Sequence, residues 1–411
     1  MDDVKAAIRQ AVDQLAGELE TLSTQIHDHP ELGYQEVRAA GWLTGFLEGK
    51  GFSVERGVGG IETAFRATLE RGPGPTVAVL CEYDALPGIG HACGHNVIAA
   101  SGAGAGAALA RVRDRLPAGR VQVIGTPAEE GGGGKVQLIR AGIFEGVDCA
   151  MMIHGFDRTL LHQDLLGIVQ VDFEWHGKAS HAAADPWEGL NALDACVQTF
   201  STIGMLRQQM RPDCRVHGII RKGGDAPNVI PEHTAASFLV RAPRIDAMWE
   251  LHRRVVACAE GAARATGTTL GVRQPGEVYE PLRRNQTLLD LFAANMGSVG
   301  LAEGGAIPDR LGSSDVGNVS QVLPTIQPMI GIAPLGMPIH TREFAEAAAG
   351  PIARAGMLAA ATTMALTAFD LLADPARVRT AREEFARGES APRSVRPARR
   401  PPPERATPSP R

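Results

Sequence analysis

The side chains best suited to metal or acid–base chemistry follow three short apolar runs. Each run is rich in Val, Ile or Met, and a stretch long enough for a helix separates it from the next. These side chains are Asp84 after residues 77–83, Glu129 and Glu130 after residues 121–125, and His154 after residues 148–153. Because open α/β sheets bind ligands at the carboxyl ends of their strands, we expect these side chains to meet at one sheet edge.

A glycine-flanked loop at residues 90–96 adds a thiol and an imidazole. Its sequence, Gly-His-Ala-Cys-Gly-His-Asn, places Cys93 and His95 two residues apart, so both could reach one ion or two neighbouring ions. Thiolate, imidazole and carboxylate together are ligands that Zn²⁺ favours. Alone, Cys93 could be a small buried residue and His95 a helix N-terminal cap. Together with the carboxylates and His154, they predict a metal site.

Two adjacent glutamates suit the two carboxylate roles of a metal hydrolase. One carboxylate binds the ion, and the other stays free to take a proton from water and deliver it to the leaving group. Neighbouring side chains in an extended segment point in opposite directions, so a turn at residues 126–128 would have to aim Glu129 and Glu130 at one site. The competing interpretation is a solvated loop beside the glycine run at residues 131–134.

Four polar residues outside these runs are further candidates for binding or catalysis. His181 follows a strand pattern, although a lone histidine at such a place is more often structural. Asn228 and Arg241 could together hold a substrate carboxylate, but Arg241 could also be a surface strand residue. His340 opens a predicted helix, where it could supply a last metal ligand or simply cap the helix.

The hydrophobic pattern predicts an α/β domain that is split by an inserted domain. Two helices are expected at residues 5–27 and 36–50, before the three buried strands. Farther along, the order becomes strand, helix, strand, strand, helix, strand, which is the ferredoxin-like α+β unit. We therefore predict a catalytic domain with its first part at 1–168 and its second part at 284–380, interrupted by a domain at 169–283.

The charge of the chain is unevenly distributed between its body and its tail. The formal net charge is -5, and the tail at 388–411 contains six Arg and two Glu, or +4, so the remaining chain carries -9. An acidic body argues against nucleic acid as the main partner. The tail is rich in Pro and Arg without periodicity and is predicted to be disordered.

Cysteine usage and the apolar segments indicate the compartment. The six cysteines are scattered over 411 residues, and the first residues lack the basic and apolar regions of a secretory signal. We therefore expect reduced thiols in a cytoplasm. The Ala-rich stretch at residues 357–373 contains three Thr and one Asp, which predicts a packed helix and not a membrane span.

Several of these segments together resemble the dinuclear metallopeptidase and amidohydrolase superfamily, which includes aminoacylases, hippurate hydrolases and indole-acetyl-amino-acid hydrolases. Residues 81–96, 125–135 and 178–183 look closest to the aminobenzoyl-glutamate hydrolase and β-alanyl-lysine dipeptidase branch. The resemblance spans about residues 20–370. It implies a phosphorylase/hydrolase-like catalytic domain with a mixed sheet, and an inserted lid domain that also forms a homodimer.

Carried over position by position, the resemblance implies a role for each candidate residue. The implied roles are metal binding for Cys93, His95, Glu130, His154 and His340, proton transfer for Glu129, orientation of the site for Asp84, oxyanion stabilisation for His181, and binding of the substrate carboxylate for Asn228 and Arg241. Two divalent ions are implied, Zn²⁺ or Mn²⁺. Better-known relatives have His-x-Asp and a bridging Asp where this chain has Glu82-Tyr83-Asp84 and Cys93.

These observations predict a cytoplasmic two-metal amidohydrolase. Its substrate would be an N-acyl amino acid, an aminobenzoyl-glutamate-like compound or an unusual dipeptide, with neither nucleic acid nor a membrane as a partner. The alternative hypothesis is a non-catalytic protein that holds a peptide or acyl amino acid in the cleft under the lid. Such a binder would tolerate a broken ligand set, whereas every implied ligand and the base are present.

Overall fold

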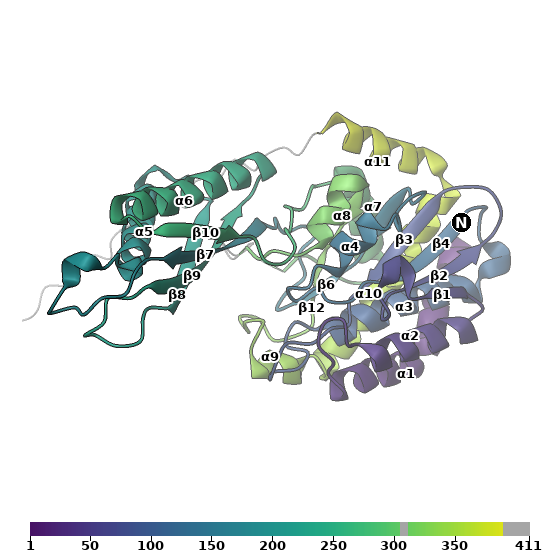
Figure 1. The fold of residues 1–411 in the computed structure, drawn as a ribbon. Helices are drawn as coiled ribbons and strands as arrows, with labels where there is room; N and C mark the ends of the chain where they lie inside the picture. Colours follow the sequence, from purple (N-terminus) through teal and green to yellow (C-terminus); the bar gives the residue numbers. More distant parts are fainter. Residues whose placement is uncertain (305–310, 389–411) are drawn as a thin grey trace, which may run out of the picture.

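The computed structural model describes residues 1–304 and 311–388 and shows a larger and a smaller body (Figure 1). The larger body contains both ends of the described chain, and the smaller body is formed by the middle of the chain. Of the tail predicted at 388–411, all but Gly388 lies outside the described residues.

A six-stranded mixed sheet forms the centre of the larger body. In spatial order its strands are β1 (Ser53–Arg56), β2 (Phe65–Glu70), β4 (Arg120–Gly125), β3 (Thr76–Cys81), β5 (Cys149–Met151) and β11 (Thr325–Ile326). The strands from β4 to β11 are parallel, whereas β1 and β2 are antiparallel to their neighbours. A separate parallel pair joins β6 (His154–Phe156) to β12 (Met329–Gly331). The predicted mixed α/β architecture is confirmed.

Nine helices surround this sheet within the described ranges. They are α1 (Asp2–Asp28), α2 (Val37–Gly49), α3 (His95–Arg111), α4 (Gly134–Arg140), α7 (Gln286–Ser298), α8 (Val316–Val322), α9 (Arg342–Ala347), α10 (Pro351–Ala373) and α11 (Pro375–Arg387). The central helix α3 packs against β3, α1 and α10. A Cβ atom at Gly102 would lie 2.5 Å from the Cys81 sulfur, so glycine is needed for this close approach of α3 to β3. The first residue of α3 is His95, which this packing holds at the sheet edge.

Helix α10 contains the Ala-rich segment of the sequence. By length and composition it is the one helix in the described part of the chain that could cross a membrane, and 83% of its most apolar window is buried inside the protein. It contacts α1, α3 and α7. The helix is therefore part of the core, as predicted.

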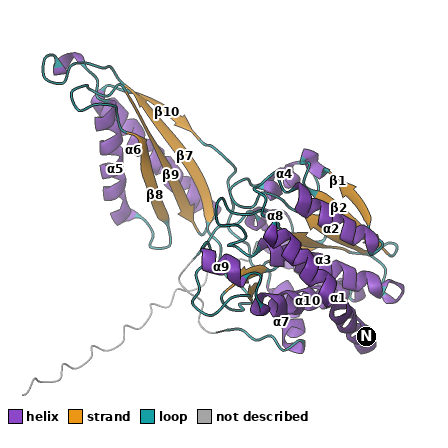
Figure 2. Ribbon diagram, turned by 90° about the horizontal axis from the view of Figure 1, so that it is seen from below, coloured by secondary structure: helices purple, strands orange, loops and turns teal. Residues whose placement is uncertain are grey.

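The smaller body has its own sheet and core (Figure 2). Its elements are β7 (Gly167–His176), α5 (Ala192–Leu206), β8 (Arg215–Lys222), β9 (His233–Ala242), α6 (Ile245–Thr266) and β10 (Thr269–Arg273). The strand order β10-β7-β9-β8, with every neighbour antiparallel, is that of the ferredoxin-like unit. Both helices pack on one face of the sheet, which leaves the opposite face open.

Strand β7 leads away from the larger body. Its first residues lie near that body, where Ile168 pairs with Tyr279, and its last residue, His176, lies at the far end of the small sheet. Ten residues at about 3.3 Å each make this strand about 30 Å long. The loops that follow β7 and precede β9 therefore form a distal tip.

Candidate metal centre and active site

The parallel strands β3, β4 and β5 end at one edge of the large sheet, and candidate side chains lie just beyond them. Asp84 and Glu129 are buried there, and His154 is the first residue of β6. The backbone N–H of Thr126 donates to the Cys81 carbonyl oxygen at 2.8 Å, which ties the segment after β4 to the end of β3. The structure thus brings together the residues that the sequence placed after three separate strands.

Asp84 orients the ring of His95. Its Oδ1 lies 3.1 Å from His95 Nδ1, and its Oδ2 accepts a hydrogen bond of 2.8 Å from the backbone N–H of Glu130. Burial would raise the pKa of Asp84, but the charge and hydrogen bond of His95 and the backbone donors lower this pKa below the ordinary value. The His95 side chain caps no helix, and its Nε2 points away from Asp84 toward other carboxylates.

The surroundings of His95 Nε2 favour a cation. This nitrogen lies 3.6 Å from Glu82 Oε2, 3.9 Å from Glu129 Oε2 and 3.9 Å from Glu130 Oε1. Three buried atoms here, Glu82 Oε2, His95 Nε2 and Glu130 Oε1, have no hydrogen-bond partner. Unpartnered buried polar atoms are costly. A metal ion bound by His95 and Glu130 would satisfy two of these three atoms, so the donor set fits a metal site.

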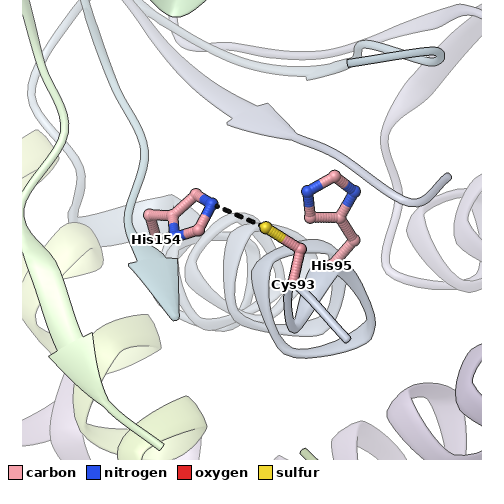
Figure 3. A group of neighbouring side chains, drawn as sticks. All are labelled: Cys93, His95 and His154. Atoms are coloured by element: carbon pink, nitrogen blue, oxygen red, sulfur yellow. Dashed lines mark hydrogen bonds between the residues drawn. The ribbon is translucent and has the colours of Figure 1, made fainter. Parts of the chain in front are cut away.

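Cys93 and His154 extend the cluster on the side facing β6 (Figure 3). The Cys93 sulfur lies 3.4 Å from His154 Nε2, and His154 Nδ1 lies 2.7 Å from the carbonyl oxygen of Gly155. That carbonyl places the proton on Nδ1 and leaves the Nε2 lone pair facing the thiol. Burial lowers the pKa of His154 to about 4, which favours the neutral imidazole that binds metals.

His340 reaches the cluster from the second part of the larger body. Its Nε2 lies 3.7 Å from Glu130 Oε1, and its backbone N–H donates to the Ala92 carbonyl oxygen at 2.8 Å. The prediction that His340 opens a helix is wrong. The backbone of His340 has a φ of 63°, and the next residue, Thr341, caps α9 through its side chain. The turn outside the helix directs the imidazole to the metal ligands instead of along α9.

The candidate ligand atoms form four overlapping groups within the described larger body, in each of which they lie within 4.8 Å of one another. These groups are Cys93–His95–His154, Cys93–Glu130–His340, His95–Glu129–Glu130 and Glu82–Glu129–Asp315. Cys93 belongs to two of them, and so does Glu130. The five implied ligands could therefore hold two neighbouring ions.

Glu129 is held beside these ligands by backbone contacts. Ala128 has a φ of 59°, which makes the turn that aims both glutamates at the site. Glu36 Oε1 accepts a hydrogen bond from the Ala128 N–H at 2.8 Å, and the Tyr279 hydroxyl donates to the Glu129 carbonyl oxygen at 2.6 Å. Burial, followed by the charges of nearby carboxylates, raises the pKa of Glu129 well above its ordinary value. A carboxylate with a raised pKa is suited to accept a proton.

A buried ion-pair group of Lys135, Glu82 and Asp315 beside this site was not predicted from the sequence. Lys135 is fully buried, and its Nζ donates to Glu82 Oε1 at 2.5 Å and to Asp315 Oδ1 at 2.6 Å. Burial would lower the pKa of Lys135, but these two carboxylates raise it above the ordinary value, so the ammonium stays charged. The only sequence signals for this group were the position of Lys135 directly after the glycine run and that of Asp315 directly after Gly-Ser-Ser.

The residues of the smaller body do not all reach the metal cluster of their own chain. Arg241 lies at the near end of the small sheet, where its Nη1 donates to Ser313 Oγ at 3.1 Å, two residues before Asp315. His181 and Asn228 are exposed and lie in the two tip loops, where the Ala182 N–H donates to the Asn228 carbonyl oxygen at 3.0 Å. The length of β7 separates these loops from the larger body.

The chain matches the model of the peptidase family M20/M25/M40 over residues 78–361, which is more than half of its length. The chain belongs to this family. The Xaa-Arg dipeptidase of Mus musculus is 40% identical over 93% of this chain and 92% of its own length. A p-aminobenzoyl-glutamate hydrolase chain of Escherichia coli is 30% identical over 93% of this chain and 95% of its own.

Solved structures show the same fold. A putative aminohydrolase of Staphylococcus aureus covers 90% of this chain and all of its own, with a TM-score of 0.78 and 21% identity. A dinuclear metal binding M20 peptidase of Bacillus subtilis covers 88% of this chain and 99% of its own, with a TM-score of 0.69 and 20% identity.

Membership of the M20 family confirms the predicted class of function. The chain is a metal-dependent hydrolase of amide or peptide bonds, as the sequence predicted. The alternative of a non-catalytic binding protein finds no support among these relatives. The predicted resemblance to aminobenzoyl-glutamate hydrolases and indole-acetyl-amino-acid hydrolases is also confirmed.

Proposed function

We propose that this M20 protein is a two-metal dipeptidase that removes a basic residue, Arg or Lys, from the C-terminus of a dipeptide. The observation that carries the two-metal part is that two ligand groups share Cys93, beside the unpartnered buried atoms His95 Nε2 and Glu130 Oε1. The Xaa-Arg dipeptidases of mouse and human, 40% and 37% identical over 93% of the chain, support the basic residue.

The proposed ligands divide between two neighbouring ions, Zn²⁺ or Mn²⁺. One group is Cys93 with His95 and His154, and the other is Cys93 with Glu130 and His340. Divalent ions bound there would polarise the scissile carbonyl and make water a better nucleophile at neutral pH.

Glu129 is the proposed proton carrier. Its carboxylate is buried among other carboxylates, with the Tyr279 hydroxyl fixing its backbone at 2.6 Å. It takes a proton from the attacking water and delivers it to the departing amine. Asp84 holds the His95 ring in one orientation, and so keeps this proposed metal ligand in place beside Glu129.

His181 is the proposed donor to the oxyanion, and it acts on the partner subunit's site. Its Nδ1 accepts hydrogen bonds from the N–H groups of Ala183 and Ala184 at 3.2 and 3.1 Å. The Nε2–H is therefore left to donate. Because about 30 Å of β7 separates the tip from the larger body, a second subunit is required to bring a tip to each metal cluster.

A homodimer through the smaller body would provide that arrangement. The edge strand β8 exposes Ile219 and Ile220, by 66% and 44%, and α5 exposes Val197 and Met205, by 49% and 73%. An exposed edge strand with apolar side chains is a surface prepared for pairing with a second copy. We propose this surface as the dimer interface, so that the smaller body is both the lid and the dimerisation domain.

The substrate carboxylate is assigned to Asn228 and Arg241. Arg241 is partly buried and contacts Ser313 at the near end of the small sheet, whereas Asn228 lies at the tip. The two residues therefore meet at one substrate only when the Asn228 comes from the partner subunit. The six free thiols suit a reducing compartment, and we propose a cytoplasmic location.

The proposed function is tested by a substrate screen on the metal-stripped and reconstituted full chain. Dipeptides ending in Arg or Lys are compared with aminobenzoyl-glutamate and simple N-acyl amino acids, each with Zn²⁺ or Mn²⁺ and with no metal. We expect the highest kcat/KM for the basic dipeptides, and hydrolysis only after metal is added. A preference for aminobenzoyl-glutamate would overturn the substrate, and full activity of the stripped protein would overturn the two-metal mechanism.

A further inference from the structure

A second group of metal-ligand side chains lies on the open face of the small sheet. His176 of β7 and His233 of β9 stand directly opposite each other in the register of the two strands. Glu174 precedes His176 by two residues and so points to the same face. The three side chains are 56%, 32% and 49% exposed, for His176, His233 and Glu174 respectively. They are thus accessible to an ion from solution.

The three ligand atoms converge at one point above the sheet. Glu174 Oε2 lies 3.2 Å from His233 Nε2 and 3.8 Å from His176 Nε2. The two imidazole rings are parallel within 1°, with centroids 4.8 Å apart. In a tetrahedral zinc site, bonds of about 2.0–2.2 Å place neighbouring ligand atoms about 3.3 Å apart. A small side-chain rotation therefore suffices to bring all three atoms onto one ion.

We propose that the lid carries a third metal site, formed by His176, His233 and Glu174, for a divalent transition metal such as Zn²⁺ or Ni²⁺. Two imidazoles and one carboxylate are the donors such ions prefer, and exposure leaves the remaining positions to water. The competing explanation is a carboxylate–imidazole hydrogen bond without a metal. The site is separate from the catalytic cluster and does not depend on the proposed function.

The position of this site gives it a consequence for the tip. His176 is the last residue of β7 and His233 the first of β9, so the site lies where both tip loops leave the sheet. The loops are paired beyond this point, because the Gly177 N–H donates to the Glu232 carbonyl oxygen at 2.8 Å and the Ile230 N–H to that of Ser180 at 3.0 Å. An ion bound at their base would tie β7 to β9 and hold the tip in one conformation.

The experiment measures the zinc content of the full chain after loading with Zn²⁺ and gel filtration. The variants are His233→Gln and Glu174→Gln, and the matched control is His217→Gln, an exposed histidine on the same open face of the sheet. We expect both lid variants to lose about one zinc per chain, with the control unchanged. In the Cys93→Ala/His154→Ala double variant, the lid zinc should remain.

A thermal measurement provides a second readout. An ion that binds the folded lid stabilises it by mass action. Added Zn²⁺ should therefore raise the Tm of the Cys93→Ala/His154→Ala protein. The additional substitution His233→Gln in that protein should abolish the increase. Equal zinc content in wild type, His233→Gln and Glu174→Gln would overturn the site. A Tm increase that survives His233→Gln would do the same, because the ion would then bind elsewhere.

Discussion

The metal cluster of the larger body and the tip of the smaller body contrast in how their functional residues are held. In the cluster, His95 and Asp84 are buried and are fixed by residues from several separate segments. At the tip, His181 is exposed, and its Nδ1 accepts hydrogen bonds from two N–H groups of its own loop. The fold therefore prearranges the proposed metal ligands and base, whereas the proposed oxyanion donor lies on an arm that, in our proposal, a second subunit delivers.

The largest effect is expected from the two adjacent glutamates of the cluster. Glu129→Gln should retain both metals but lose about 10²- to 10⁴-fold in kcat, because the proposed proton carrier is removed. Glu130→Gln should instead lose metal, because this residue is a proposed ligand. Metal content and kcat of the two variants decide between these roles, and wild-type turnover in Glu129→Gln would falsify the base assignment.

The buried lysine of the cluster should matter most for stability. Lys135→Met leaves Glu82 and Asp315 buried without a cation, which should cost about 3–5 kcal/mol in the free energy of unfolding. The matched control is Lys178→Met in the smaller body, whose lysine is 61% exposed and should cost less than about 0.5 kcal/mol. Urea denaturation measures both, and similar small losses would show that Lys135 is not essential to the cluster.

At the tip, loss of a side chain should affect rate and leave the cluster intact. His181→Ala should lower kcat by about 10²- to 10³-fold through loss of the proposed oxyanion donor. Metal content and the midpoint of urea denaturation should stay at the wild-type values, because the His181 side chain is exposed. A loss of metal in this variant would contradict the separation between tip and cluster.

The smallest effect concerns the carboxyl group that supports the Ala128 turn. Burial raises the pKa of Glu36 from 4.5 to about 7, a shift worth about 3 kcal/mol. Because the folded protein holds this proton more tightly than the unfolded chain, the Glu36 contribution to stability is lost as pH rises from about 4.5 to 7. Glu36→Gln should therefore match wild type at pH 4.5 and exceed it by about 2–3 kcal/mol at pH 8. An equal difference at both pH values would contradict the raised pKa.

Much of the fold and of the cluster could be predicted because the relevant signals are local. Apolar runs followed by Asp84, Glu129 and His154 marked the parallel strands and the edge where they end. The alternation of strands and helices in the smaller body indicated the ferredoxin-like order. Both patterns depend on residues close together in sequence, where hydrophobic periodicity is informative.

Other features depend on contacts between distant segments. Lys135 follows four glycines and looks like a loop residue, but its partners Glu82 and Asp315 are 53 and 180 positions away. His340 resembled the start of a helix, whereas Thr341 provides the cap and a left-handed backbone turns the imidazole toward Glu130. Tertiary packing decides both the burial of Lys135 and the orientation of His340, and the local sequence around each residue does not indicate it.

The most direct test of the account mixes two inactive proteins, Glu129→Gln and His181→Ala, under conditions that exchange subunits. In a heterodimer, one site combines the intact Glu129 of one subunit with the intact His181 of the other. Random pairing through a two-fold interface should then restore about a quarter of wild-type activity. No activity in verified heterodimers would contradict the central claim that each metal cluster is completed by the tip of the partner subunit.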